Sequence, residues 1–129
     1  MKAIKNIIVK IVEIVAIFAV ALAITNCFKI AQVSGSSMDP TLKDGDILIV
    51  WALGEPKDND IVIMNTDNTG LNVPYIVKRY DAEKSTVGTM WVEGDNKDNS
   101  IDSRRIGTID KNNYIGTVLF DVNQMKIMK

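Results

Sequence analysis

The stretch ILIVWAL, residues 47–53, is the first of several short apolar runs that indicate a β domain. Similar runs follow at residues 61–64, 71–80, 86–93 and 114–122, with turn-rich clusters at 54–60, 65–70 and 81–85. Helical periodicity is absent beyond Val33, so we expect these runs to be strands of a mainly β fold. Pro74 cannot donate to a ladder, so the third strand should begin after it, lie at an edge or carry a bulge.

The composition suits one compact domain beside an apolar N-terminal segment, with 129 residues that are 47% hydrophobic and 24% charged. We expect residues 1–31 to be a cytoplasmic N-terminus with a transmembrane anchor, and residues 32–129 to be an extracytoplasmic β-sheet domain. The last seven residues, NQMKIMK, are expected to fray. The net charge is −1 and the cations are mostly scattered, so we expect no nucleic acid partner.

The anchor is an apolar run of 18 residues, 7–24, interrupted only by Lys10 and Glu13. As a helix it would span about 27 Å, close to the thickness of a bilayer core. Lys10 can snorkel to the interface and pair with Glu13 along one helix face. The single cysteine, Cys27, is expected to lie unmodified at the membrane boundary.

An alternative for this segment is a secretory signal peptide that is removed, because Ala21 and Ala23 resemble a cleavage site. We favour retention, since the apolar run is longer than the usual ~7 to 15 residues of a signal peptide core. Lys2 and Lys5 precede the run and Lys10 lies near its start, whereas only Lys29 lies just behind it. The positive-inside rule therefore predicts a single-pass cell membrane protein with a cytoplasmic N-terminus.

Two segments carry candidate chemistry, SGSSMDPT at residues 34–41 and YIVKRY at residues 75–80. The chain contains no histidine, so a nucleophilic serine would need another base. Lys78 follows Ile76 and Val77 in a strand-like run, and burial there would lower its pKa towards neutrality. Taken singly, each segment has an ordinary explanation, a loop serine in the first and a solvated charge pair at a strand end in the second.

Taken together, four stretches behind an apolar anchor resemble the bacterial type I signal peptidases. The stretches are SGSSMDPT, GDILIV at residues 45–50, VKR at residues 77–79, and GDNKDNSIDSR at residues 94–104. The family is a group of membrane serine proteases that remove signal peptides from exported proteins. The resemblance implies that Ser37, directly before Met38, is the nucleophile in preference to Ser36, and that Lys78 is the general base.

The same resemblance assigns supporting roles. It implies that Ser100 hydrogen-bonds the Lys78 amine and that Asp102 pairs with Arg104, since a carboxylate touching the lysine would raise its pKa. The oxyanion hole would use the Ser37 amide and the position of Gly35, where some members have a serine hydroxyl. Family positions that line shallow pockets for small residues before the cut correspond to Met38, Leu42, Ile76 and Val77.

One departure from the family is the short segment between Arg79 and Gly94, which indicates a minimal core without an accessory domain. The partners implied are signal peptides of preproteins and the lipid bilayer, and we expect a monomer. No cofactor or metal is expected, because no His or Cys cluster exists, and an EF-hand fails at Ser100 and Ile106. Two alternatives remain, a self-cleaving repressor-type protease without its DNA-binding half, and a non-catalytic membrane-tethered β scaffold.

Overall fold

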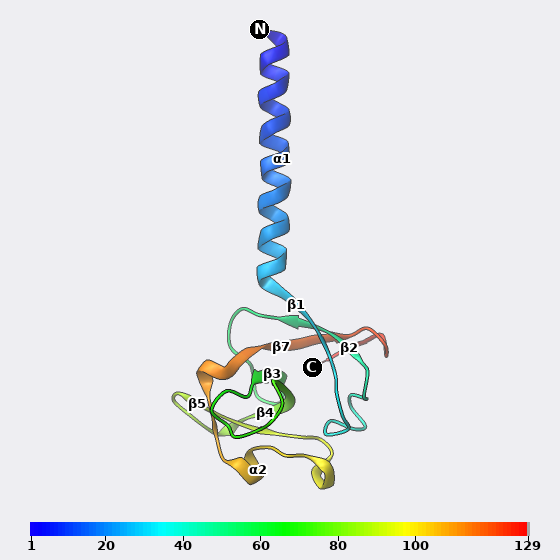
Figure 1. The fold of residues 1–129 in the computed structure, drawn as a ribbon, viewed down its shortest axis with the longest axis vertical. Helices are drawn as coiled ribbons and strands as arrows, with labels where there is room; N and C mark the ends of the chain where they lie inside the picture. Colours follow the sequence, from blue (N-terminus) through cyan, green and yellow to red (C-terminus); the bar gives the residue numbers. More distant parts are fainter. Residues whose placement is uncertain (129) are drawn as a thin grey trace.

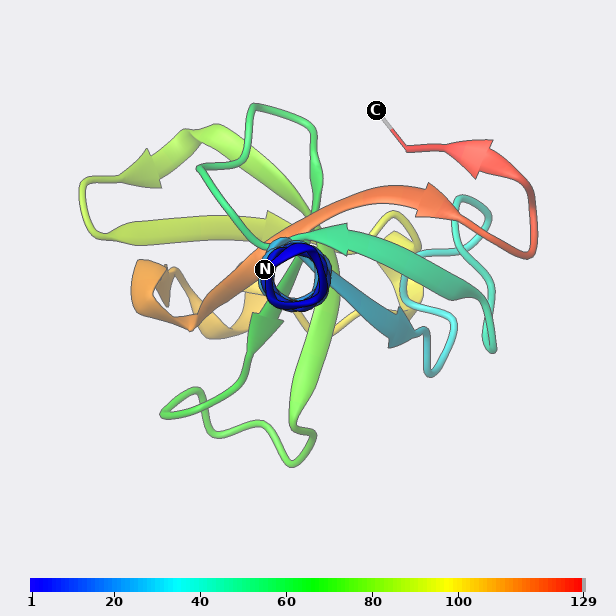
Figure 2. The same ribbon diagram turned by 90° about the horizontal axis from the view of Figure 1, so that it is seen from above.

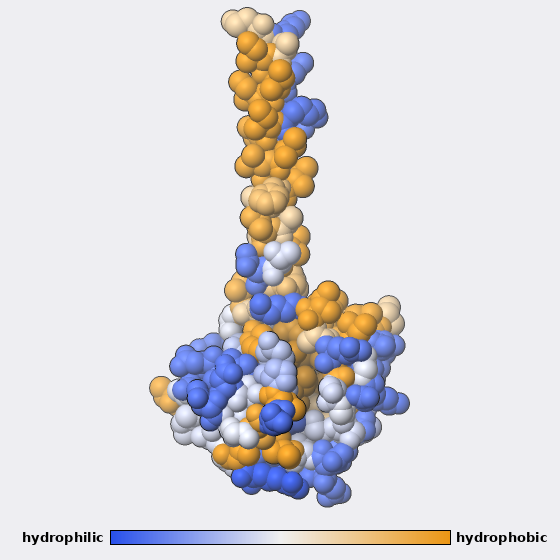
Figure 3. Space-filling view, in the orientation of Figure 1, coloured by the Kyte–Doolittle hydropathy of each residue, from blue (hydrophilic) through white to orange (hydrophobic). Residues whose placement is uncertain are grey.

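The protein consists of one long N-terminal helix joined directly to a β domain, in a computed structural model that describes residues 1–128 (Figure 1). Helix α1 spans Lys2–Cys27, and strand β1 begins at the next residue, Phe28. The helix extends away from the domain, and none of its residues is buried. Its length and composition suit a membrane span, and apolar surface covers most of it in Figure 3. Lys10 and Glu13 form the expected pair, at 2.8 Å.

The β domain is a curled antiparallel sheet of eight strands, which confirms the mainly β prediction (Figure 2). Its strands are β1 Phe28–Gln32, β2 Ile47–Trp51, β3 Ile61–Asn65, β4 Tyr75–Thr86, β5 Thr89–Glu93, β6 Ile109–Asp110, β7 Tyr114–Asp121 and β8 Lys126–Ile127. Their order is β1-β2-β7-β3-β4-β5-β6, and β8 pairs with β7. Short helices lie at α2 Ser103–Ile106, η1 Lys97–Asn99 and η2 Lys111–Asn113.

Three local predictions are corrected by the structure. Strand β4 begins directly after Pro74, as expected, but it runs through the predicted turn at residues 81–85 and turns only at Val87 and Gly88. Strand β1 was not predicted, because residues 28–31 were assigned to the anchor region. The end of the chain does not fray, since β8 pairs with β7 and Met128 packs into the core; Lys129 lies outside the described residues.

The core is divided between two faces of the curled sheet. One cluster includes Met38, Leu42 and Val118, and the other includes Met90 and Val92. Neighbouring residues of β4 serve both clusters, because alternate side chains of a strand point to opposite faces. Ile76 lies in the second cluster, whereas Val77 packs against the first, and this alternation makes Lys78 one of the few buried charged residues.

Candidate active site

The site is built where the loop after β1 meets the first half of β4. Lys78 lies on β4 opposite Val62 of β3, and only 4% of its surface is exposed. Ser37 lies in the loop, and its Oγ is 2.6 Å from Lys78 Nζ. The ammonium donates in this contact when the lysine is protonated, whereas the hydroxyl donates when the amine is neutral.

Burial is the main influence on the pKa of Lys78, and it lowers the pKa below its ordinary value. The carboxylate of Asp102 acts in the opposite direction, and the guanidinium of Arg104 acts in the same direction as burial. The lysine therefore stands in surroundings that favour the neutral amine. A neutral amine can accept a proton, which is the property a general base requires.

Asp102 is fully buried and accepts hydrogen bonds from three residues. Arg104 donates to it from Nε at 2.9 Å and from Nη2 at 2.5 Å, so the pairing expected between these two residues is present. The N–H of Gly94 and the hydroxyl of Ser100 also donate to it, at 2.7 and 2.6 Å. Burial acts to raise the pKa of Asp102, but these hydrogen bonds outweigh it and hold the pKa well below its ordinary value.

Ser100 differs from the expected arrangement, because its hydroxyl donates to Asp102 and not to the Lys78 amine. A buried carboxylate is a stronger acceptor than a neutral amine, an ammonium accepts no hydrogen bond, and a hydroxyl has a single proton to give. Ser100 also lies against Gly94, where an added Cβ would stand 2.1 Å from the serine Oγ. Glycine at position 94, directly after β5, therefore allows the main chain to lie this close to Ser100.

Residues 95–99, here called the strap, hold the loop that carries Ser37. No individual role was predicted for these residues. Asp95 accepts from Nε and Nη2 of Arg79, at 2.8 and 2.6 Å, and from the hydroxyl of Thr41 at 2.6 Å. Asn96 donates its N–H to the carbonyl of Ser37 at 2.9 Å. The strap thereby ties β4, which carries Lys78, to the loop that carries Ser37.

A groove of about 1500 Å³ runs past Ser37 and Lys78. It is lined mainly by residues 29–38, 71–78 and 98–101, including Met38, Ile76 and Val77, whereas Leu42 lies beneath it in the core. Strand β1 is the first in the sheet order, and the pairing of β4 with β5 begins only at Arg79. Two strand edges free of strand partners among the described residues therefore border the groove.

Gly35 and Ser37 differ in the use of their amides. The Gly35 N–H donates to Asp44 Oδ1 at 2.7 Å, and its φ of +89° is one that side chains rarely adopt. Within residues 1–128, the N–H of Ser37 donates no hydrogen bond. The described residues also contain no group of three or more His, Cys, Asp or Glu side chains that could hold a metal ion.

Comparison with known proteins relates this sequence to a class of peptidases. The family described as "Signal peptidase, peptidase S26" matches residues 4–82 and 81–122. The chain is 29% identical to Signal peptidase I of Bacillus licheniformis, over 88% of each protein. It is 31% identical to Signal peptidase I T of Bacillus subtilis (strain 168), over 75% of this chain and 76% of that protein. It is also 31% identical to Mitochondrial inner membrane protease subunit 2 of Saccharomyces cerevisiae, over 73% of this chain and 67% of that protein.

The chain therefore belongs to the signal peptidase family, peptidase S26. It is a serine peptidase, and its family supports the removal of signal peptides as its activity. This membership confirms the predicted resemblance and favours an enzyme over a non-catalytic scaffold.

Proposed function

We propose that the protein is a single-pass membrane endopeptidase in which Ser37 and Lys78 form the catalytic dyad. The observation that carries the proposal is the 2.6 Å contact between Ser37 Oγ and Lys78 Nζ. Its support is the burial of the lysine, which lowers the pKa of Lys78, in a chain that contains no histidine. A serine hydroxyl next to a neutral amine has both the nucleophile and the base that acyl transfer needs.

In the proposed reaction, the neutral Lys78 amine takes the Ser37 proton as Oγ attacks the scissile carbonyl. The negative oxygen of the tetrahedral intermediate is stabilised by the Ser37 N–H. The intermediate collapses to an acyl-enzyme as the Lys78 ammonium gives its proton to the leaving amine. A water molecule, deprotonated by Lys78, then attacks the acyl carbon, and collapse of that intermediate returns the proton to Ser37.

The supporting residues have separate tasks in this proposal. Arg104 and Ser100 occupy the oxygens of Asp102, so the carboxylate does not capture the Lys78 ammonium directly. Gly35 shapes the turn before the nucleophile, and its amide is already used by Asp44. The oxyanion hole thus depends on the Ser37 amide, with Gly35 contributing through its backbone conformation.

The proposed substrate is an extended segment of a preprotein with small residues at the first and third positions before the cut. Strand edges of β1 and β4 border the groove, and a peptide can bind such an edge by adding a strand. The side chains at the first and third positions before the cut would then share one face, that of Met38 and Val77, and the intervening side chain would lie on the face of Ile76; all three residues line the groove. A shallow apolar surface leaves little room for large side chains and so selects small ones.

The proposed topology places the N-terminus in the cytoplasm and the β domain outside it. Lysines precede the apolar part of α1, and the positive-inside rule retains such residues in the cytoplasm. Because β1 follows α1 without a linker, the groove would lie close to the membrane surface from which signal peptides emerge. We therefore propose an anchor within residues 1–31 and a catalytic domain of residues 32–129, to whose sheet strand β1, Phe28–Gln32, also belongs.

The dyad is tested with the detergent-solubilised full chain and a preprotein that carries an Ala-x-Ala sequence before its cleavage site. Ser37→Ala and Lys78→Ala should each abolish cleavage, and Ser85→Ala, at a serine outside the groove, serves as the matched control. Mass spectrometry of the product should locate the cut directly after the second alanine. Undiminished cleavage by either dyad variant would rule out this mechanism.

A further inference from the structure

We propose that Asn96 is a positioning residue for oxyanion stabilisation, acting through the peptide group between Ser36 and Ser37. Its side-chain amide donates from Nδ2 to the carbonyl oxygen of Ser36 at 3.0 Å. That same carbonyl also accepts the N–H of Asp39 at 3.1 Å. The proposal rests on the proposed function, because it takes Ser37 as the nucleophile and the Ser37 N–H as the oxyanion donor.

The argument depends on the rigidity of one peptide group. A trans peptide is planar, so its C=O and N–H bonds point in opposite directions and turn together. Two hydrogen bonds that hold the Ser36 carbonyl therefore also fix the direction of the Ser37 N–H. That N–H donates no other hydrogen bond within the described chain, so it is free to bind an oxyanion.

Asn96 also holds the carbonyl of Ser37 itself. The main-chain N–H of Asn96 donates to the Ser37 carbonyl at 2.9 Å, and an added Cβ on Gly94 would lie 2.6 Å from that oxygen. Asn96 thus bonds the carbonyls on both sides of the Ser37 Cα, one through its side chain and one through its backbone. A donor fixed in advance is more effective than one that must reorient during the reaction.

The side-chain contribution can be removed alone. Asn96→Ala deletes the bond to the Ser36 carbonyl and retains the backbone bond to Ser37. Asn96→Asp keeps the shape but places a carboxylate, which cannot donate, against that carbonyl. A matched control is Asn113→Ala, since Asn113, which does not itself line the groove, makes a similar bond from Nδ2 to the carbonyl of Asp67 at 2.8 Å.

The experiment measures preprotein cleavage by the full chain in detergent as a function of substrate concentration and pH. Loss of a whole oxyanion donor costs about 10²- to 10³-fold in kcat, so a misdirected donor should cost about 10-fold or more. We expect both Asn96 variants to lower kcat by that amount with KM and the pH midpoint of the rate unchanged. Asn113→Ala should leave kcat at the level of the unmodified protein.

A second readout uses two peptides that end in Ala-x-Ala. A peptide aldehyde adds the Ser37 hydroxyl to its carbonyl and forms a tetrahedral adduct, whereas the product peptide with a free carboxylate does not. The Asn96 variants should lose affinity for the aldehyde in proportion to kcat and keep their affinity for the product peptide.

Several outcomes would overturn the inference. One is an unchanged kcat in Asn96→Ala; another is a fall in kcat with a shifted pH midpoint, which would indicate a disturbed dyad. An equal loss in Asn113→Ala would indicate a general structural effect. Should Asn96→Ala fail to fold, the same measurements on Asn96→Asp decide the question. Ser37→Ala in the same assay separates the two proposals, because its undiminished activity would remove the proposed function itself.

Discussion

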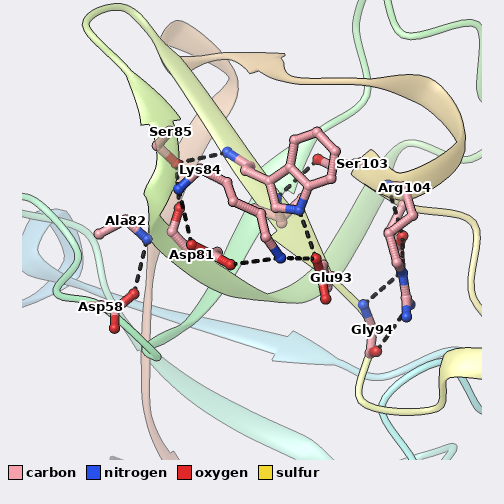
Figure 4. A network of polar contacts seen from close by, with 12 residues as sticks. Asp58, Asp81, Ala82, Lys84, Ser85, Glu93, Gly94, Ser103 and Arg104 are labelled. Atoms are coloured by element: carbon pink, nitrogen blue, oxygen red, sulfur yellow. Dashed lines mark hydrogen bonds and ion pairs between the residues drawn. The ribbon is translucent and has the colours of Figure 1, made fainter.

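Strand β4 carries two lysines whose ionisation is shifted in opposite directions. Lys78, in the first half of the strand, is 4% exposed, and burial lowers its pKa. Lys84, near the end, is exposed and bonds Glu93 and Asp81 at 2.8 and 3.0 Å, as Figure 4 shows. The hydrogen bonds to Glu93 and then Asp81 raise the pKa of Lys84.

The comparison shows that carboxylate contact, and not burial alone, decides the direction in which the pKa of a lysine shifts. Lys84 has two carboxylates within direct reach and stays an ammonium. Asp102, the carboxylate that raises the pKa of Lys78, is instead bonded to Arg104 and Ser100. Within residues 1–128, the Lys78 amine forms a hydrogen bond only with the Ser37 hydroxyl. A buried lysine on a strand is therefore suited to act as a base where the nearby carboxylate is paired with a guanidinium.

The largest expected effect comes from Lys78→Arg. Guanidinium stays protonated and cannot accept the Ser37 proton. The rate of preprotein cleavage should therefore fall by about 10²- to 10⁴-fold or more, the loss typical of a missing general base. Lys84→Arg, the same substitution on the same strand, should leave the rate unchanged. Initial rates of cleavage by both variants make the test, and an active Lys78→Arg enzyme would contradict the assignment of the base.

Arg104→Gln should make the surroundings of Lys78 more like those of Lys84, because it removes the guanidinium that pairs with Asp102. Without the guanidinium, Asp102 remains buried and unpaired, which should lower the free energy of unfolding by about 3 kcal/mol or more. Asp102 raises the pKa of Lys78 and Arg104 lowers it, so the pH midpoint of kcat/KM should move to higher pH. Chemical denaturation and a pH–rate profile provide the measurements, with the neighbouring Arg105→Gln as the stability control. An unmoved midpoint would show that Arg104 does not offset Asp102.

Lys78→Met sharpens the comparison through stability. The pKa of Lys78 is lower in the folded than in the unfolded protein, so the unfolded chain binds more protons between these two values. The stability of the unmodified protein should therefore rise with pH through this window, up to the ordinary value of 10.5. The inactive methionine variant should lack this contribution and be more stable near neutral pH, with a gain that shrinks towards pH 10.5. Denaturation midpoints at several pH values measure the effect, and a constant gain at every pH would contradict it.

The sequence predicted most strands because burial leaves a local pattern. Strands β2, β3 and β7 are apolar runs bounded by turn residues, and their positions agree with the expected ones within a few residues. Strand β1 leaves no such signal, since Phe28–Gln32 is short, mostly exposed and contains two polar residues, Lys29 and Gln32. The turn at residues 81–85 was wrong because its polar residues lie on an exposed part of β4, where a strand needs no apolar side chains.

The candidate site divides in a similar way. Ser37 and Lys78 were predicted from motifs, but their contact joins residues 41 positions apart, which no local pattern reports. The roles of Asp95 and Asn96 were missed for the same reason, since Asn96 and Ser36 are 60 positions apart. From sequence alone, polar loop residues are expected to face solvent, and only the structure shows that Asn96 bonds main-chain carbonyls. The partner of Ser100 also depended on geometry, because both Lys78 and Asp102 were chemically suitable acceptors.

The smallest expected effect is that of Lys84→Met, which tests the exposed half of the comparison. Lys84 bridges Asp81 and Glu93 on the surface and lies 5.7 Å from the ring centroid of Trp91. Exposed ion pairs are screened by salt and add little stability. We therefore expect a slightly lower melting temperature in dilute buffer, a difference that shrinks in high salt, and an unchanged rate of preprotein cleavage. Thermal unfolding at two salt concentrations measures this, and a loss of activity in Lys84→Met would show that the β4–β5 hairpin and the Lys78 end of the strand are coupled, which the separate surroundings of the two lysines argue against.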